Sequence, residues 1–233
     1  LGDELDSVMN YPFRDAVCDF LTCRTDAYAL YEKLSGQRER YPEPFYGACM
    51  NLFGSHDTQR ILSCLSDAPP KDTLTREQQA EYQYKPEAVV RGKRRLYAAF
   101  ALMFSMPQPP CIYYGDEAGM MGLSDPFNRG SYPWGREDIE IRSFVMQLSA
   151  LRRCNAALSS GKTAFAAPCA DAFAVLRCRG EESALTLVNR ADHAVCAALG
   201  AEDFREGPDA LNVLTADKYY DAFEVGTGLQ KDL

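Results

Sequence analysis

Residues 48–58 read Ala-Cys-Met-Asn-Leu-Phe-Gly-Ser-His-Asp-Thr, a short apolar run followed at once by a polar loop. The run at 48–53 has the length and character of a buried strand, and the glycine after it begins the loop that carries His56 and Asp57. Two other segments repeat this pattern: residues 5–9 run into Asn-Tyr-Pro, and residues 111–114 run into Gly-Asp-Glu. The sequence therefore predicts three short buried strands, each followed by a polar loop.

Helical patterns separate these strands. Apolar residues recur at helical spacing in residues 13–21, 26–40, 86–106 and 138–154, and Thr75 with Gln78 forms a capping box for a short helix. We expect residues 10–12, Asn-Tyr-Pro, to separate the first strand from the first helix. Short apolar strands alternating with helices pair in parallel. Enzymes built this way place their chemistry at the carboxyl ends of the strands.

The pattern changes after Gly161. Short apolar runs at 173–177, 185–189 and 194–199 are separated by turn signals, which is typical of an antiparallel sheet. The sequence thus predicts an α/β part at residues 1–155 and an all-β part at residues 160–233.

Composition excludes several classes of protein. The chain has 233 residues, of which 46% are hydrophobic, so one large or two modest folded domains are expected. A net charge of −8 argues against nucleic acid as a partner, because such partners usually need a basic face. No apolar run reaches the roughly 18 residues of a membrane helix. The chain opens with Leu1 instead of methionine, and its first residues do not resemble a signal peptide. We therefore expect a processed product or an excised piece.

The nine cysteines are odd in number and form no Cys-x-x-Cys pair. A disulfide framework is usually even-numbered, so we predict buried thiols in a reducing compartment and a cytoplasmic location. The two histidines, His56 and His193, lie far from any paired cysteines, and we predict no metal site. No cofactor is predicted.

Three loops could carry chemistry. The pair of His56 and Asp57 offers a hydrogen-bond donor and a carboxylate to a polyhydroxy ligand, although alone it also fits a turn with capping residues. Tyr-Tyr-Gly-Asp-Glu at 113–117 alone fits aromatic packing followed by a cap. Asp-Pro-Phe-Asn-Arg at 125–129 alone fits a turn.

Taken together and in this order, these segments resemble the α-amylase superfamily of glycoside hydrolases. The resemblance rests on residues 5–13, 51–58 and 110–117, with Asp125-Pro-x-Asn-Arg129 and Tyr132-Pro-Trp134 fitting the loop after the last strand. The motifs are most similar to those of the neopullulanase, cyclomaltodextrinase and maltogenic amylase branch. The resemblance implies strands six to eight of a (β/α)₈ TIM barrel, followed by an all-β C-terminal sandwich domain. A complete barrel needs about 250 residues, so we expect only the C-terminal part of the barrel here.

The resemblance also implies roles for particular residues. Asp57 matches the carboxylate that stabilises the transition state, His56 the histidine that hydrogen-bonds the sugar, and Asp125 with Arg129 a pair that contacts the same sugar. The family's nucleophile and general acid, which in a retaining glycosidase lie about 5–5.5 Å apart, have no match in this sequence. We therefore expect the chain to be inactive alone.

The expected parent is a retaining glycoside hydrolase acting on α-1,4-glucans, with an α-glucan oligosaccharide as its partner and no nucleic acid or membrane. One alternative is a transglycosylase of the same superfamily, and another is a non-catalytic relative with a binding or structural role. Strands six and eight would lack barrel neighbours, so we expect the chain either to form a homo-oligomer or to cover these strand edges with displaced segments. Calcium could bind a longer enzyme but leaves no signal in this sequence.

Overall fold

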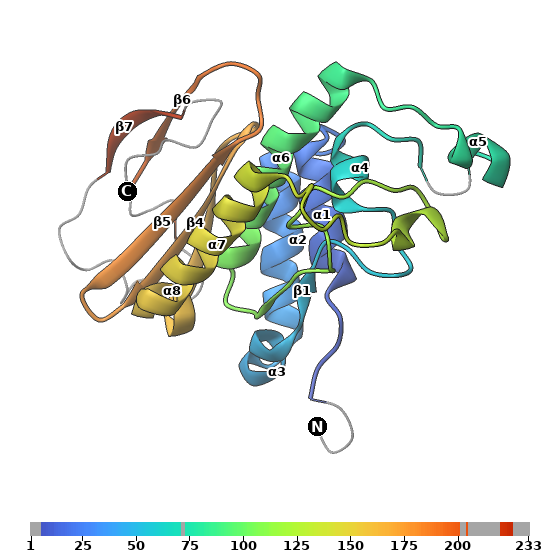
Figure 1. The fold of residues 1–233 in the computed structure, drawn as a ribbon. Helices are drawn as coiled ribbons and strands as arrows, with labels where there is room; N and C mark the ends of the chain where they lie inside the picture. The colour runs from blue at the N-terminus through green and yellow to red at the C-terminus, as the bar shows by residue number, and fades with distance from the viewer. Residues whose placement is uncertain (1–5, 71–72, 201–203, 205–219, 226–233) are drawn as a thin grey trace.

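A computed structural model describes residues 6–70, 73–200, 204 and 220–225. The helices are α1 (Tyr11–Leu21), α2 (Ala27–Arg40), α3 (Glu43–Ala48), α4 (Ile61–Leu65), α5 (Arg76–Ala80), α6 (Pro86–Ser105), α7 (Ile139–Cys154) and α8 (Ala156–Ser160), with the 3₁₀ turn η1 (Phe127–Arg129). The strands are β1 (Asn51–Leu52), β2 (Pro110–Cys111), β3 (Lys162–Cys169), β4 (Ala172–Arg179), β5 (Glu182–Asn189), β6 (Val195–Leu199) and β7 (Tyr220–Val225). Helices α2 and α6 both pack against the sheet of β3–β5, and α7 packs against α6 (Figure 1).

The three predicted strands pair in parallel, as expected. Strand β1 pairs with β2 in the register Asn51 to Pro110, and Met9 forms a parallel bridge to Met50. The paired segments are much shorter than the apolar runs, and Ala48 belongs to α3 instead of a strand. Proline at 110 removes one ladder donor. Beyond the ladder, arginine side chains bind the strand carbonyls: Arg14 Nε donates to the oxygen of Phe53 at 2.8 Å.

A chain of buried amides crosses all three strand segments. Asn10 Nδ2 donates to Asn51 Oδ1 at 2.7 Å, and Asn51 Nδ2 donates to Gln108 Oε1 at 3.2 Å. All three side chains are buried, so these bonds satisfy polar groups that would otherwise be costly inside the protein. The amide chain fixes the alignment of the strands where the regular ladder is too short to do so.

The long predicted helices are confirmed to within two residues at either end. The first begins earlier than expected: α1 includes Tyr11 and Pro12, and Asn10 caps it by accepting from the backbone N–H of Phe13 at 3.2 Å. Proline in a first helical turn loses no helical hydrogen bond, so it does not separate strand from helix here. The capping box of Thr75 and Gln78 is present at α5.

The C-terminal strands form antiparallel sheets, with β3-β4-β5 in one and β6-β7 in the other. One face of the larger sheet packs Phe165 and Phe173 into the core formed by the helices, while Ala166 and Leu176 on its other face join a second cluster with Leu199. Strands β4, β5 and β6 confirm the predicted runs, whereas β3 was not predicted. Residues beyond 200 lie largely outside the described residues, and the domain division at 155–160 stays a prediction.

Two arginines bind the C-terminal end of α6, one from α7 and one from the sheet. Arg152 on α7 donates to the backbone oxygens of Phe104 and Met106 at 2.7 and 2.6 Å, and also to those of residues 107 and 108. Arg177 on β4, which is buried, donates to the oxygen of Ser105 at 2.9 Å. Helix α6 has no basic residue in its own last turn, so these two cations satisfy the carbonyls at its C-terminus.

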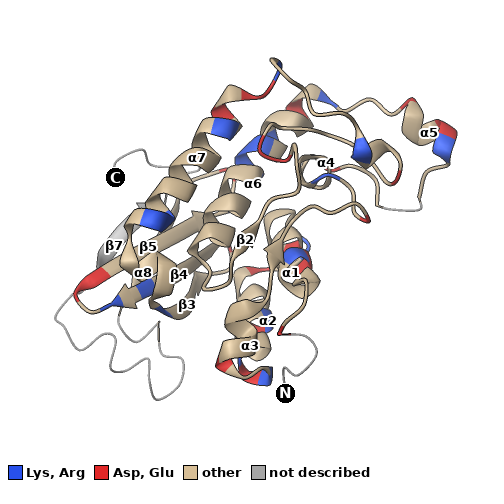
Figure 2. Cartoon of the chain, turned by 60° about the horizontal axis from the view of Figure 1, so that its bottom comes forward, with Lys and Arg blue, Asp and Glu red and all other residues tan. Residues whose placement is uncertain are grey.

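Within the described part of the chain, no helix is both long and apolar enough to cross a membrane. Basic and acidic positions are interspersed over the helices in Figure 2, in keeping with a chain of moderate net charge. All nine cysteines lie in described segments and are free thiols. The prediction of buried thiols is wrong for several of them. Cys18 and Cys49 are buried, but Cys23, Cys154 and Cys196 are exposed, because their positions lie at element ends or on an outer face.

Candidate functional site

His56 and Asp57 lie in the loop that follows β1, at its carboxyl end. Nε2 of His56 is 3.1 Å from Oδ2 of Asp57, and their side chains are 60% and 64% exposed. The pair can therefore present one ring and one carboxylate to a ligand without first breaking a buried contact. An exposed imidazole and carboxylate suit hydrogen bonding to hydroxyl groups.

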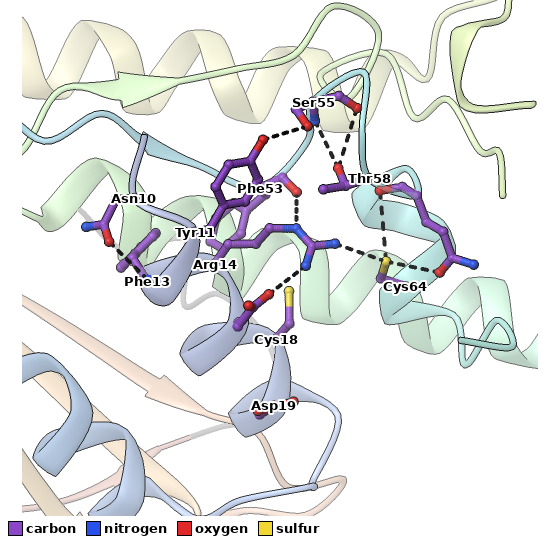
Figure 3. A network of polar contacts seen from close by, with 12 residues as sticks. Asn10, Tyr11, Phe13, Arg14, Cys18, Asp19, Phe53, Ser55, Thr58 and Cys64 are labelled. Atoms are coloured by element: carbon purple, nitrogen blue, oxygen red, sulfur yellow. Dashed lines mark hydrogen bonds and ion pairs between the residues drawn. The ribbon is translucent and has the colours of Figure 1, made fainter. Parts of the chain in front are cut away.

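The backbone of this loop is held by hydroxyl groups. The amide of Asp57 donates to Ser55 Oγ at 3.1 Å, the amide of Ser55 donates to Thr58 Oγ1 at 3.0 Å, and the Tyr11 hydroxyl donates to Ser55 Oγ at 3.1 Å. Figure 3 shows Tyr11 reaching Ser55 from α1, above the bond from Arg14 to the oxygen of Phe53. Helix α1 thus positions the loop from below.

A buried ion pair follows the loop in the chain. Arg60 Nη1 lies 3.2 Å from Asp116 Oδ1, and both side chains are almost fully buried. The guanidinium also lies over the rings of Tyr113 and Tyr114, with its carbon 4.4 and 4.5 Å from the two centroids. Burial raises the pKa of Asp116 to about 7, against the opposing effect of Arg60.

Gly54 is required by this packing. A Cβ at residue 54 would overlap Oδ2 of Asp116 and crowd Tyr113, so only glycine lets the loop approach the buried carboxylate this closely. The small residue at the end of the strand thereby connects the loop to the turn at 113–117.

Asp125 and Arg129 form the second predicted pair. Their side chains meet at 2.7 Å across the 3₁₀ turn and are 59% and 45% exposed. Between them lies Asn128, which is fully buried and whose Nδ2 donates to the backbone oxygens of His56 and Thr58 at 2.9 and 2.8 Å. The structure therefore brings together the two loops that carry all four predicted site residues.

The residues that hold the site together are Arg60, Asp116 and Asn128, and the sequence analysis gave none of them a role, although Asp116 and Asn128 stand in the motifs it quotes. Their partners lie 54 to 72 positions away along the chain. An arginine shortly after an acidic loop and an asparagine inside a turn are common, so neither carried a signal on its own.

Two thiols near the loop, the buried Cys18 and the partly buried Cys64, are poor candidates for chemistry. Burial raises the pKa of Cys18 to about 12 and also raises that of Cys64, although Arg14 lies beside both. Both thiols therefore stay protonated near neutral pH and are weak nucleophiles. Among the described residues, no cluster of three or more His, Cys, Asp or Glu side chains could hold a metal ion.

Comparison with known proteins decides the family. Residues 1–163 match the α-amylase family, described as the α-amylase catalytic domain. The chain belongs to this α-amylase family. The amylopullulanase of Thermoanaerobacter thermohydrosulfuricus is 40% identical over 172 residues, which cover 69% of this chain and 11% of that protein. The cyclomaltodextrinase of Geobacillus thermopakistaniensis is 30% identical over 224 residues, covering 94% of this chain and 34% of that protein.

Solved structures agree with the family. The cyclic α-maltosyl-(1→6)-maltose hydrolase of Arthrobacter globiformis, solved with that sugar bound, aligns with a TM-score of 0.73 and 26% identity. The alignment covers 97% of this chain and 44% of that one. The chain thus spans less than half the length of these α-amylase relatives. It has the fold of part of an α-amylase catalytic domain, which is of the TIM-barrel type, and the matched residues include all four predicted site residues.

Proposed function

We propose that this chain is the C-terminal part of the catalytic barrel of a retaining glycoside hydrolase that acts on α-1,4-glucans. In this proposal β1 is the seventh barrel strand, flanked by the sixth, around Met9, and the eighth, β2. Strands β3–β7 belong to the C-terminal sandwich of the family. The parallel order of the three segments supports this assignment.

The observation that carries the proposal is the joining of the two exposed pairs. His56 and Asp57 follow one strand, Asp125 and Arg129 follow the next, and both loops are bound to the same buried asparagine. Two carboxylates, an imidazole and a guanidinium on one rim offer both donors and acceptors to the hydroxyls of a sugar ring.

Each residue then has a distinct role. Asp57 binds the hydroxyls of the sugar at the cleaved bond and stabilises the positive charge of the oxocarbenium-like transition state. His56 donates a hydrogen bond to the same sugar, and Asp125 with Arg129 grips it from the neighbouring loop. The nucleophile and the general acid belong to preceding barrel strands of a longer protein. The location is cytoplasmic, in keeping with the free cysteines.

Sequencing the gene around this segment and assaying its full product tests the proposal. The longer reading frame should encode an aspartate nucleophile and a glutamate acid, and its product should release reducing ends from maltoheptaose or cyclodextrin with retained anomeric configuration. Product analysis with maltotriose separates hydrolysis from transglycosylation. A reading frame without those two carboxylates would favour the non-catalytic alternative and would overturn the proposal.

A further inference from the structure

One buried side chain connects the two loops of the site. Asn128 is fully buried, so it cannot touch a ligand. Both hydrogens of its amide group are used: Nδ2 donates to the oxygen of His56 at 2.9 Å and to the oxygen of Thr58 at 2.8 Å. These two carbonyls flank Asp57 along the chain. The two bonds therefore hold the peptide that precedes Asp57 and the peptide that follows Thr58.

Asn128 is itself fixed to the rest of the barrel part. Its backbone oxygen accepts a hydrogen bond from Arg60 Nε at 2.7 Å, and the same guanidinium binds Asp116 and the backbone oxygen of Tyr114. Because Arg60 is buried and lies over two tyrosine rings, it is a rigid support. Any movement of Asn128 would move the turn that carries Asp125 and Arg129.

We infer that Asn128 is a positioning residue, which sets the orientation of His56 and Asp57 relative to Asp125 and Arg129. The inference rests on the proposed function for its effect on turnover, but the geometry it describes can be tested without any substrate. An amide is the group that this position needs. A carboxylate of the same shape would face two carbonyl oxygens with no hydrogen to donate, and a serine would have only one.

The substrate-free test uses the two histidines of the chain, His56 and His193. Each pairs with a neighbouring aspartate, at 3.1 Å for His56 and at 3.0 Å for His193. Asn189 provides a matched control, because its Nδ2 donates to the backbone oxygen of His193 at 2.8 Å. In NMR spectra of the 233-residue chain at fixed pH, Asn128→Ala should shift the ring resonances of His56 and leave those of His193 in place. Asn189→Ala should do the reverse.

The kinetic test uses the longer enzyme. Asn128→Asp and Asn128→Ala should each lower kcat on maltoheptaose by about 10²-fold, since displacing reacting groups by about 1 Å costs that much, while KM changes less. Asn128→Ser, which keeps one donor, should lose less activity, and Asn189→Asp should keep wild-type turnover.

Two results would overturn the inference. One is unchanged His56 resonances and turnover within about twofold of wild type in the folded Asn128 variants. The other is loss of fold in all three variants, which would make Asn128 a folding residue only. An inactive wild-type enzyme would instead count against the proposed function, and the histidine spectra would still decide the positioning role.

Discussion

The carboxylate of Asp57 is exposed and contacts the ring of His56, while the backbone amide of Asp57 donates to Ser55 Oγ. Replacing Asp57 with asparagine therefore removes a charge from the site and disturbs little packing. In the longer enzyme we expect Asp57→Asn to lower kcat by about 10²–10³-fold, since loss of one preorganised group at a developing charge has effects of that size.

Steady-state kinetics on maltoheptaose measure this effect. Asp192→Asn serves as the control, because Asp192 makes a similar exposed pair with His193 in the turn between β5 and β6. Near-normal turnover by Asp57→Asn would mean that the residue is wrongly assigned.

Asp116 makes stability depend on pH. Its pKa is raised by burial from an ordinary value of 3.8 to about 7, so the folded protein binds this proton more tightly than the unfolded chain. The proton stabilises the fold fully below pH 4, and this contribution is lost as the pH rises through 7. Between pH 5 and 8 we expect the free energy of unfolding to fall by about 3 kcal/mol at most on this account.

Denaturant unfolding of wild type and Asp116→Asn at several pH values isolates that contribution. The amide does not ionise, so the stability of the variant should fall less steeply over this pH range. The exposed Asp15→Asn should retain the slope of the wild type. Parallel curves for wild type and Asp116→Asn would contradict the raised pKa.

At the scale of elements, the end of α6 depends on an arginine from another helix. Arg152 binds backbone oxygens at 104 and 106–108, and nothing in α6 replaces it. We expect Arg152→Met to lower the free energy of unfolding by about 3 kcal/mol, because hydrogen bonds from charged groups to buried carbonyls are among the strongest. Thermal unfolding measures this loss, with the exposed neighbour Arg153→Met as the control. Equal stability of both variants would contradict the role of Arg152.

The elements differ in how far the sequence predicts them. Helices follow from local signals, such as the periodicity of α6 or the capping box at Thr75, and those signals act over a few residues. The bounds of β1 and β2 depend instead on distant partners, because Arg14 and Arg60 bind the carbonyls where the ladder would continue. Such contacts leave no periodic pattern.

The same reasoning applies to the site. His56, Asp57, Asp125 and Arg129 were predicted because the short motifs that contain them resemble those of the α-amylase superfamily. The buried residues that join those motifs act across 54 to 72 positions of sequence, and a single sequence does not reveal which distant segments meet. Motifs therefore indicate which exposed side chains carry the chemistry, whereas the structure is needed to find the buried residues that hold them in place.

At the scale of the whole molecule, the outer strand segment exposes apolar side chains. Met9 bridges to Met50 on one side, yet the side chains of Val8 and Met9 are 51% and 38% exposed. Apolar residues at a strand edge favour pairing with another chain. We expect the isolated chain to self-associate as its concentration rises, as measured by light scattering. Val8→Lys should weaken the association and Val90→Lys on α6, at an equally exposed position, should not. A monodisperse monomer at all concentrations would contradict this.

The 233-residue chain alone should hydrolyse no α-glucan at a detectable rate. A retaining mechanism needs a nucleophile and an acid about 5–5.5 Å apart on either side of the bond. Asp57 does not fill either role in the proposed site, because it binds ring hydroxyls and supports the developing charge without attacking the anomeric carbon. His56 could donate a proton, but it has no second group positioned to form the covalent intermediate.

Weak affinity for maltose-like sugars is compatible with this prediction, since the two exposed pairs remain in place. Incubating the purified chain with maltoheptaose or cyclodextrin and assaying reducing ends is the decisive measurement, and Asp57→Ala separates true turnover from a contaminating enzyme. Contaminating activity would persist in the variant. Turnover that disappears in Asp57→Ala would instead require a nucleophile within these residues, and would show that the chemistry of this α-amylase family member does not depend on preceding barrel strands.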